Sequence, residues 1–193
     1  MKIYYRGGTQ LNDIPLHVIH LDQDDPKKCT SRKMHRNGLT ELHTNLRSSP
    51  KRGILLDPLS GRLIGPEDRV TIERGGALVG LDCSWKQIES SISYLNRKTR
   101  LDGRTLPVVL AANPVSWGKP SRLSNAEAFA VSLVLLGRWE QARRVMKPFK
   151  FGEHFFELNA EPLESYAAAG TNVELAARQW EFFDKPKSDN SDF

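Results

Sequence analysis

The stretch from Leu106 to Leu136 reads LPVVLAANPVSWGKPSRLSNAEAFAVSLVLL, and three patterns follow one another within it. The run 106–110 is short and apolar, which predicts a buried strand. A loop with two prolines and a glycine follows over 111–123 and carries an aromatic side chain at Trp117. Ser124 and Glu127 then have the spacing of a capping box before an apolar run, which predicts a helix to Leu136.

A strand, loop and helix in this order can form a small-molecule site. The strand fixes the loop, and the start of the helix offers unpaired backbone N–H groups. In open parallel sheets, ligands bind at the carboxyl ends of the strands. The same unit also occurs without a ligand, so its shape favours a site without establishing one.

Four more apolar runs precede this stretch, and they indicate the fold class. They are continuous rather than alternating and are separated by polar or helical segments, of which 86–96 has Ile88, Ile92 and Leu95 at helical spacing. This pattern predicts an α/β fold with a mostly parallel sheet covered on both faces. The predicted strands are 16–21, 39–43, 53–58 and 77–81.

After Ser124 the patterns are helical. Helices are predicted over 138–147, where Pro148 ends the helix, over 152–169 with a break near Glu161 and Pro162 and a cap at Gly170, and over 172–183. We therefore expect an α/β domain over 1–105 and a domain over 106–184 made of the strand, the loop and an all-helical half. The composition of 185–193 predicts a disordered tail.

The positive charge lies in the first quarter of the chain. Residues 1–52 contain 10 Lys and Arg against 5 Asp and Glu, whereas the other 141 residues contain 18 of each kind. This asymmetry favours a basic face for a polyanion such as nucleic acid, although a solvated surface without a partner has the same composition. The densest part follows Asp24 and Asp25 and predicts a short, exposed basic helix with candidate RNA contacts at Lys27, Lys28, Arg32 and Lys33.

Cysteine, histidine and hydropathy patterns exclude several classes of protein. Cys29 and Cys83 form no metal-binding spacing, and the five histidines form no cluster in the sequence. His17 and His20, three apart on a predicted strand, should point to opposite faces, so no metal site is expected. No apolar run approaches the roughly 20 residues of a membrane span, and the first residues contain no apolar signal core, so we expect an intracellular, cytoplasmic protein.

Asp82 is the most suggestive single residue. It ends an apolar strand and precedes Trp85 by three residues, so its carboxylate can act as a general base beside an indole that excludes water. The alternative is that Asp82 caps the helix that begins near Lys86, since Asp is a favoured cap residue. Thr30 has the same two interpretations, as a ligand contact or as a helix cap. Motifs for nucleotide binding, zinc proteolysis and serine hydrolysis are absent from the sequence.

Four segments together resemble one family. They are DPKKCT over 25–30, LDP over 56–58, LDCSW over 81–85, and the AANPVSWGKPSRLSNAE core within 106–127. In this order they resemble the small-subunit ribosomal-RNA aminocarboxypropyltransferases, in the compact archaeal form. The resemblance implies a sheet like that of knotted RNA methyltransferases, with a deep trefoil knot that pattern alone would not predict.

The resemblance also implies the reaction. Family members transfer the 3-amino-3-carboxypropyl group of S-adenosylmethionine, without a metal, to N3 of a modified uridine, often N1-methylpseudouridine, in small-subunit rRNA. It implies that Asp82 takes the N3 proton and that Trp85 encloses the sulfonium methyl. We also expect the enzyme to be a monomer. The implied cofactor contacts are Thr30, Leu56, Leu81, Trp85, Leu106, Ser121 and Asn125.

Two other functions remain open from the sequence. An RNA methyltransferase on a similar knotted sheet uses the same co-substrate, and a ribosome-assembly factor can bind RNA and cofactor without turnover. Asp82 and Trp85 together favour the transferase over the assembly factor. They do not by themselves exclude methyl transfer, because both the methyl and the γ-carbon of a sulfonium are electrophilic.

Overall fold

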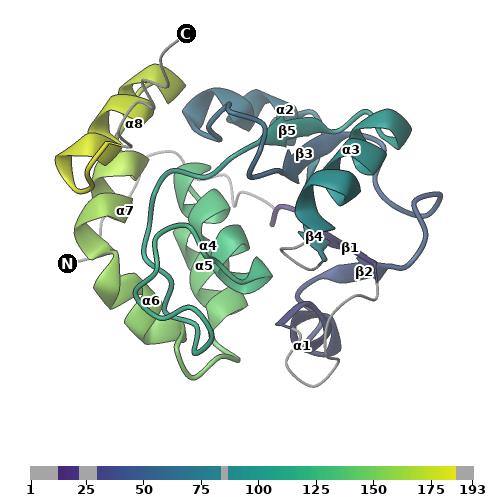
Figure 1. Cartoon of the computed structure of the whole chain (residues 1–193), viewed down its shortest axis with the longest axis horizontal. Helices are drawn as coiled ribbons and strands as arrows, with labels where there is room; N and C mark the ends of the chain where they lie inside the picture. The colour runs from purple at the N-terminus through teal and green to yellow at the C-terminus, as the bar shows by residue number, and fades with distance from the viewer. Residues whose placement is uncertain (1–12, 22–29, 84–86, 186–193) are drawn as a thin grey trace, which may run out of the picture.

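The computed structural model describes residues 13–21, 30–83 and 87–185, and within them the chain forms a parallel sheet with helices around it (Figure 1). The strand order is β2-β1-β4-β3-β5, and every neighbouring pair is parallel. This confirms the predicted α/β class and the parallel sheet. The strands are β1 (Leu16–His20), β2 (Glu41–His43), β3 (Gly53–Leu56), β4 (Ala77–Asp82) and β5 (Asp102–Arg104).

Apolar side chains cover both faces of this sheet, as predicted. Val18 and Leu78 lie in a large core with Phe129 of α4 (Asn125–Leu135), whereas Ile19 and Val79 lie in a smaller core with Ile92 of α3 (Ile88–Lys98). Neighbouring residues of one strand therefore pack against different helices, which explains the continuous apolar runs.

The other helices join these layers. Figure 1 shows α4 to α7 grouped beside the sheet, and α1 lies near the end of β2. The large core continues through this group and reaches Leu175 of α8. These helices are α1 (Thr30–Arg36), η1 (Pro66–Asp68), α2 (Arg69–Glu73), α5 (Trp139–Met146), α6 (Gly152–Leu158), α7 (Ala160–Ala167), α8 (Asn172–Arg178) and η3 (Gln179–Glu181).

The predicted strand at 106–110 is wrong. The fifth strand comes earlier, at Asp102–Arg104, in a charged segment where the sequence analysis predicted no strand. The buried Arg104 side chain forms an ion pair with the buried Asp68 carboxylate at 2.9 Å. Over 106–110 the chain forms only an isolated bridge, between Leu110 and Pro120, and several of its backbone groups bind side chains instead of a strand. Asn159 Nδ2 donates to the Leu110 carbonyl and Asn159 Oδ1 accepts from the Leu110 N–H, at 2.9 and 2.7 Å. Gln179 accepts from the Val108 N–H in the same way.

Two helix boundaries also differ from the prediction. The break between α6 and α7 falls at Asn159, not at Pro162, because Pro162 lies in the first turn of α7, where a missing N–H costs no helical hydrogen bond. Ala168 is the residue at the carboxyl end of α7, so Gly170 is not its cap; the Gly170 N–H instead binds the Glu174 carboxylate at 2.7 Å.

Replacing Asn159 with Ala should destabilise the fold by about 2–4 kcal/mol, because the N–H and C=O of Leu110 both lose their partner. Urea denaturation measures the loss. Asn37→Ala is the control, since the exposed Asn37 side chain caps only the Lys33 carbonyl; its effect should stay within about 0.5 kcal/mol. Equal stability of the two variants would contradict the pairing of Asn159 with the 106–110 segment.

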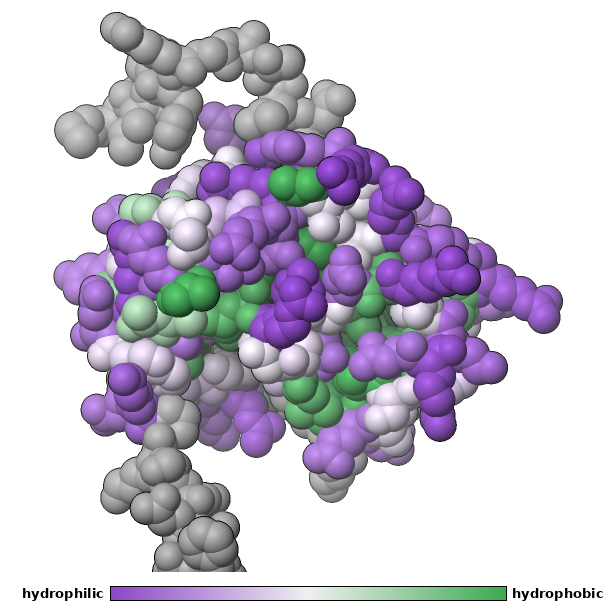
Figure 2. Space-filling view, turned by 90° about the horizontal axis from the view of Figure 1, so that it is seen from above, coloured by the Kyte–Doolittle hydropathy of each residue, from purple (hydrophilic) through white to green (hydrophobic). Residues whose placement is uncertain are grey.

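Among the described residues, no helix has the length and apolar character needed to cross a membrane. Figure 2 shows a mostly hydrophilic face on which apolar residues are visible in small areas between polar ones. The segments 1–12 and 186–193, and with them nearly all of the predicted tail, lie outside the described residues.

Candidate active site

Asp82 and His20 form a pair at the carboxyl edge of the sheet. Asp82 ends β4, His20 ends β1, and the register of these parallel neighbours places the two opposite each other. His20 Nδ1 lies 2.6 Å from Asp82 Oδ2, and both side chains are more than nine-tenths buried. The position of Asp82 follows from its apolar strand. His20 was missed as a site residue, although a histidine ending an apolar strand was the available signal.

A third residue fixes the orientation of the pair. A guanidinium nitrogen of Arg32, from α1, lies 3.0 Å from His20 Nε2. Because a guanidinium donates and never accepts, we assign Nε2 as the acceptor and a proton to Nδ1. With this assignment His20 Nδ1 donates to Asp82 Oδ2, which holds the carboxylate in one orientation.

The alternative role of Asp82, as the cap of the following helix, does not hold for α3. That helix begins at Ile88 with Gln87 at its cap position, so Asp82 lies five residues before the cap. The carboxylate of Asp82 points instead to His20, from the end of β4. The catalytic role of Asp82 stays a prediction, and its pairing with His20 gives it a second, structural interpretation.

The first residues of two helices meet at the end of β4. Asn125, which begins α4, donates through Nδ2 to the Ser31 hydroxyl at 3.1 Å and to the Leu81 carbonyl at 3.3 Å. Gly80 makes this close approach possible, because a Cβ there would lie 2.8 Å from Asn125 Oδ1. Thr30, next to Ser31, begins α1. The site residues predicted at 30, 81, 82 and 125 therefore lie around one strand end.

Glu127 organises the loop before α4. The predicted capping box is confirmed, with Ser124 as cap residue. The fully buried Glu127 carboxylate also accepts hydrogen bonds from the backbone N–H groups of Ala112 and Asn113, from Asn113 Nδ2, and from Ser124 N and Oγ, all at 2.7–2.9 Å. The sequence analysis predicted the cap but missed this second role of Glu127. A glutamate at the third position of a helix predicts a capping box and does not show that it also binds a preceding loop.

The other predicted cofactor residues are spread more widely. Leu56 and Leu106 pack in the large core on the α4 side of the sheet, whereas the Leu81 side chain lies on the α3 side. Ser121 is exposed, has a positive φ of 56°, and donates its N–H to the Val109 carbonyl. No described contact joins Ser121 to Asp82. Trp85 lies outside the described residues.

The basic helix is less exposed than expected. Arg32 contacts His20, and Lys33 Nζ lies 5.0 Å from the centre of the Phe149 ring, so both side chains are half-buried. The buried Met34 places one face of α1 against the core, and the long basic side chains beside it pack along neighbouring surfaces. Lys27 and Lys28 lie outside the described residues, and the role of all four in RNA binding stays a prediction.

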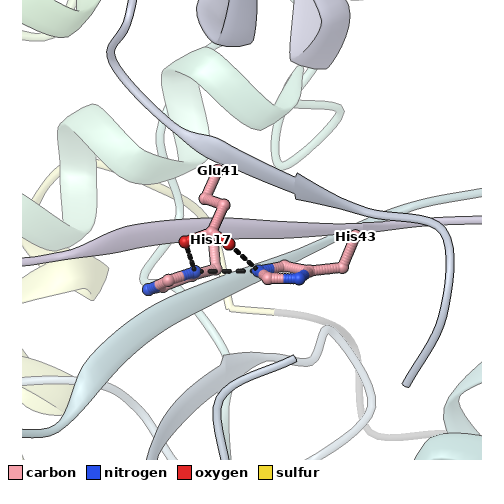
Figure 3. Close-up of side chains that lie close together, drawn as sticks. All are labelled: His17, Glu41 and His43. Carbon is pink, nitrogen blue, oxygen red and sulfur yellow. Dashed lines mark hydrogen bonds and ion pairs between the residues drawn. The ribbon is translucent and has the colours of Figure 1, made fainter. Parts of the chain in front are cut away.

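Two histidines cluster in the fold, contrary to the sequence-based expectation. His17 of β1 and His43 of β2 lie with Glu41 on adjacent strands (Figure 3). Side chains alternate between the two faces of β1 as predicted, so that His17 faces this cluster and His20 faces Asp82. The sequence did not show that β2 would lie beside β1 in this register. Burial and the neighbouring His43 lower the pKa of His17, and Glu41 opposes the change.

Comparison with known proteins agrees with the family identified from the four segments. Residues 54–183 match the family "Ribosome biogenesis protein, C-terminal". The 16S rRNA aminocarboxypropyltransferase of Methanosarcina mazei is 43% identical over 89% of this chain and 96% of its own length. The enzyme of the same name from Methanopyrus kandleri is 42% identical over 86% of this chain and 96% of its own.

A solved structure shows the same fold. The SAM-dependent rRNA:acp-transferase Tsr3 from Vulcanisaeta distributa matches with a TM-score of 0.76 and 33% identity, over 88% of this chain and 96% of that one. Residues 14–46 also match "Possible Fer4-like domain in RNase L inhibitor". That segment has a single cysteine, Cys29, whereas an iron–sulfur cluster needs about four thiolates. On the extent of these matches, the chain belongs to the 16S rRNA aminocarboxypropyltransferase family.

Proposed function

We propose that this protein transfers the 3-amino-3-carboxypropyl group of S-adenosylmethionine to N3 of a modified uridine or N1-methylpseudouridine in small-subunit rRNA, during ribosome biogenesis. The supporting observation is the Asp82 carboxylate, fixed by His20 at the end of β4 and beside the start of α4. Membership of a family of rRNA aminocarboxypropyltransferases supports the co-substrate and the class of RNA.

In the proposed reaction Asp82 is the general base. It removes the N3 proton while a bond forms between N3 and the γ-carbon of the aminocarboxypropyl group. The bond between that carbon and sulfur breaks, its electron pair stays on sulfur, and neutral methylthioadenosine leaves. Transfer by way of the methyl carbon would leave S-adenosylhomocysteine instead, so the product depends on which carbon faces N3.

The residues around the strand ends suit this co-substrate. The Thr30 hydroxyl can bind a ribose or carboxylate oxygen, and Leu56 and Leu106 offer apolar surface to an adenine. We also propose that the backbone of Leu81 contacts the co-substrate and that Trp85 encloses its sulfonium methyl. Ser121 and Asn125 would lie near its amino-acid group. Residues of this kind bind and orient a substrate without a redox or metal group.

We propose that the basic first quarter of the chain, including Lys27, Lys28, Arg32 and Lys33, lies near the RNA. Phosphate contacts of this kind position a substrate and do not read its sequence. The finer parts of the fold stay proposals that rest on the family resemblance and the sequence patterns: a trefoil knot, an all-helical half after the loop, and a division near residue 105. We also propose a monomer that acts in the cytoplasm.

The spent co-substrate identifies the reaction. Purified protein, S-adenosylmethionine and small-subunit rRNA are incubated, and the nucleoside products are measured by mass spectrometry. We expect methylthioadenosine in amounts equal to the modified rRNA. S-adenosylhomocysteine would show a methyltransferase, and intact S-adenosylmethionine bound to the protein would show an assembly factor; either result overturns the proposal.

A further inference from the structure

Three potential ligand atoms from two adjacent strands lie close together at the edge of the sheet (Figure 3). His17 Nδ1 lies 2.9 Å from His43 Nε2 and 3.5 Å from Glu41 Oε2, and His43 Nε2 lies 3.8 Å from Glu41 Oε1. A tetrahedral zinc ion with bonds of 2.0–2.1 Å separates its ligand atoms by about 3.3 Å. The two Glu41 distances are to different oxygens of its carboxylate, and one atom from each of the three residues lies within 4.8 Å of the others. Binding a cation therefore requires the exposed Glu41 side chain to turn one oxygen toward both rings, and the two ring nitrogens to move slightly apart from 2.9 Å.

The hydrogen bonds behind His43 prepare its ring to bind a cation. The Ser48 hydroxyl donates to the Asn45 carbonyl at 2.8 Å, so its oxygen is available to accept. His43 Nδ1 lies 3.2 Å from that oxygen, and we assign the ring proton to Nδ1. The Nε2 lone pair of His43 therefore points toward His17. Metal-binding histidines commonly have their other ring nitrogen fixed by such a hydrogen bond.

We propose that His17, Glu41 and His43 bind a divalent transition cation of the zinc class, with water at the fourth position. Two imidazole nitrogens and one carboxylate oxygen are a ligand set that such cations accept, and the described part of the site contributes no thiolate. Without the cation, His17 Nδ1 donates its proton to His43 Nε2. On binding, His17 changes to its other tautomer, with the proton on Nε2, and offers the Nδ1 lone pair to the cation.

The cluster is reachable from solvent and separate from Asp82. The Glu41 side chain is 64% exposed and that of His17 is 15% exposed, whereas His43 is 3% exposed. An open depression lined by Pro15, His17, Thr40 and Glu41 lies beside it. The cation would join β2, which has three residues, to β1. We infer a structural role that holds the edge strand in register and stabilises the fold on binding.

Calorimetric titration of untagged, chelator-treated protein with Zn²⁺ tests this proposal, without RNA or S-adenosylmethionine. We expect one site and a rise in Tm at saturation. His17→Gln and Glu41→Gln should each weaken binding at least tenfold, and Ser48→Ala by about tenfold, the usual effect of losing a hydrogen bond behind a ligand. Because Glu41 is exposed, Glu41→Gln should fold normally, and its own melting curve checks this.

His154→Gln is the matched control, because His154 and Glu157 form an exposed histidine–glutamate pair to which the described residues add no third ligand. It should leave Zn²⁺ affinity unchanged. Absence of binding by the wild-type protein would overturn the proposal, and so would equal affinity of wild type and the His17 and Glu41 variants. These outcomes are independent of the transferase proposal, which is measured by methylthioadenosine release.

Discussion

Asp82→Asn should lower the rate of aminocarboxypropyl transfer by roughly 10²- to 10⁴-fold, the usual contribution of a positioned general base. Asn has the size of Asp and its side-chain oxygen can still accept from His20 Nδ1, so the local contacts should persist. It cannot take the N3 proton. Affinity for S-adenosylmethionine should therefore stay within a few-fold, while single-turnover transfer to rRNA falls.

Asp102→Asn is the control for this variant. Asp102 is an exposed carboxylate on β5, at the far edge of the same sheet, and should transfer at the wild-type rate. Melting curves of both variants should match that of the wild type. If Asp82→Asn melts normally and still transfers at a near wild-type rate, Asp82 is not the base, and its pairing with His20 is structural.

Glu127→Ala should destabilise the protein by about 3–5 kcal/mol, because it removes a buried charged acceptor and leaves several backbone N–H groups unpaired. A domain typically has only about 5–15 kcal/mol of stability in total. For a chain of this size the loss lowers Tm by roughly 6–20 °C. Glu127→Gln keeps the volume but places N–H donors against other donors, so it should fall between Ala and wild type.

Thermal and urea unfolding measure this effect, with Glu164→Ala as control. Glu164 is exposed on α7 and should change the free energy of unfolding by less than about 0.5 kcal/mol. A Glu127→Ala variant that unfolds within about 1 kcal/mol of the wild type would mean that the 112–113 loop is held by other contacts. Insoluble expression of this variant, with soluble control, agrees with the prediction.

The sequence predicted those parts of the fold whose cause is local. The apolar runs that became β1, β3 and β4, and the capping box at Ser124, each depend on residues within one short segment. The 106–110 segment has the same apolar character, yet it forms no strand. Its hydrogen-bond partners Asn159 and Gln179 lie 49 and 71 residues away, beyond the reach of pattern.

The candidate site divides in the same way. Asp82 could be identified because a carboxylate at the end of an apolar strand is visible in the sequence. His20 could not be paired with it, because that requires knowing that β1 and β4 are neighbours in register. The cluster of His17 and His43 depends on the register of β1 and β2 for the same reason. The family resemblance supplied the reaction, which spacing and composition do not contain.

The pairing of 106–110 with side chains from the carboxyl-terminal helices has a consequence for synthesis on the ribosome. Every strand of the described sheet has left the peptidyl-transferase centre by residue 104, but the partners of Val108 and Leu110 are made only at residues 159–179. Contacts between residues so far apart in the sequence form late, because the chain loses the entropy of closing the loop before the contacts stabilise it. A nascent chain stalled before Asn159 should therefore display a formed sheet with an unfinished, protease-sensitive segment at 106–110.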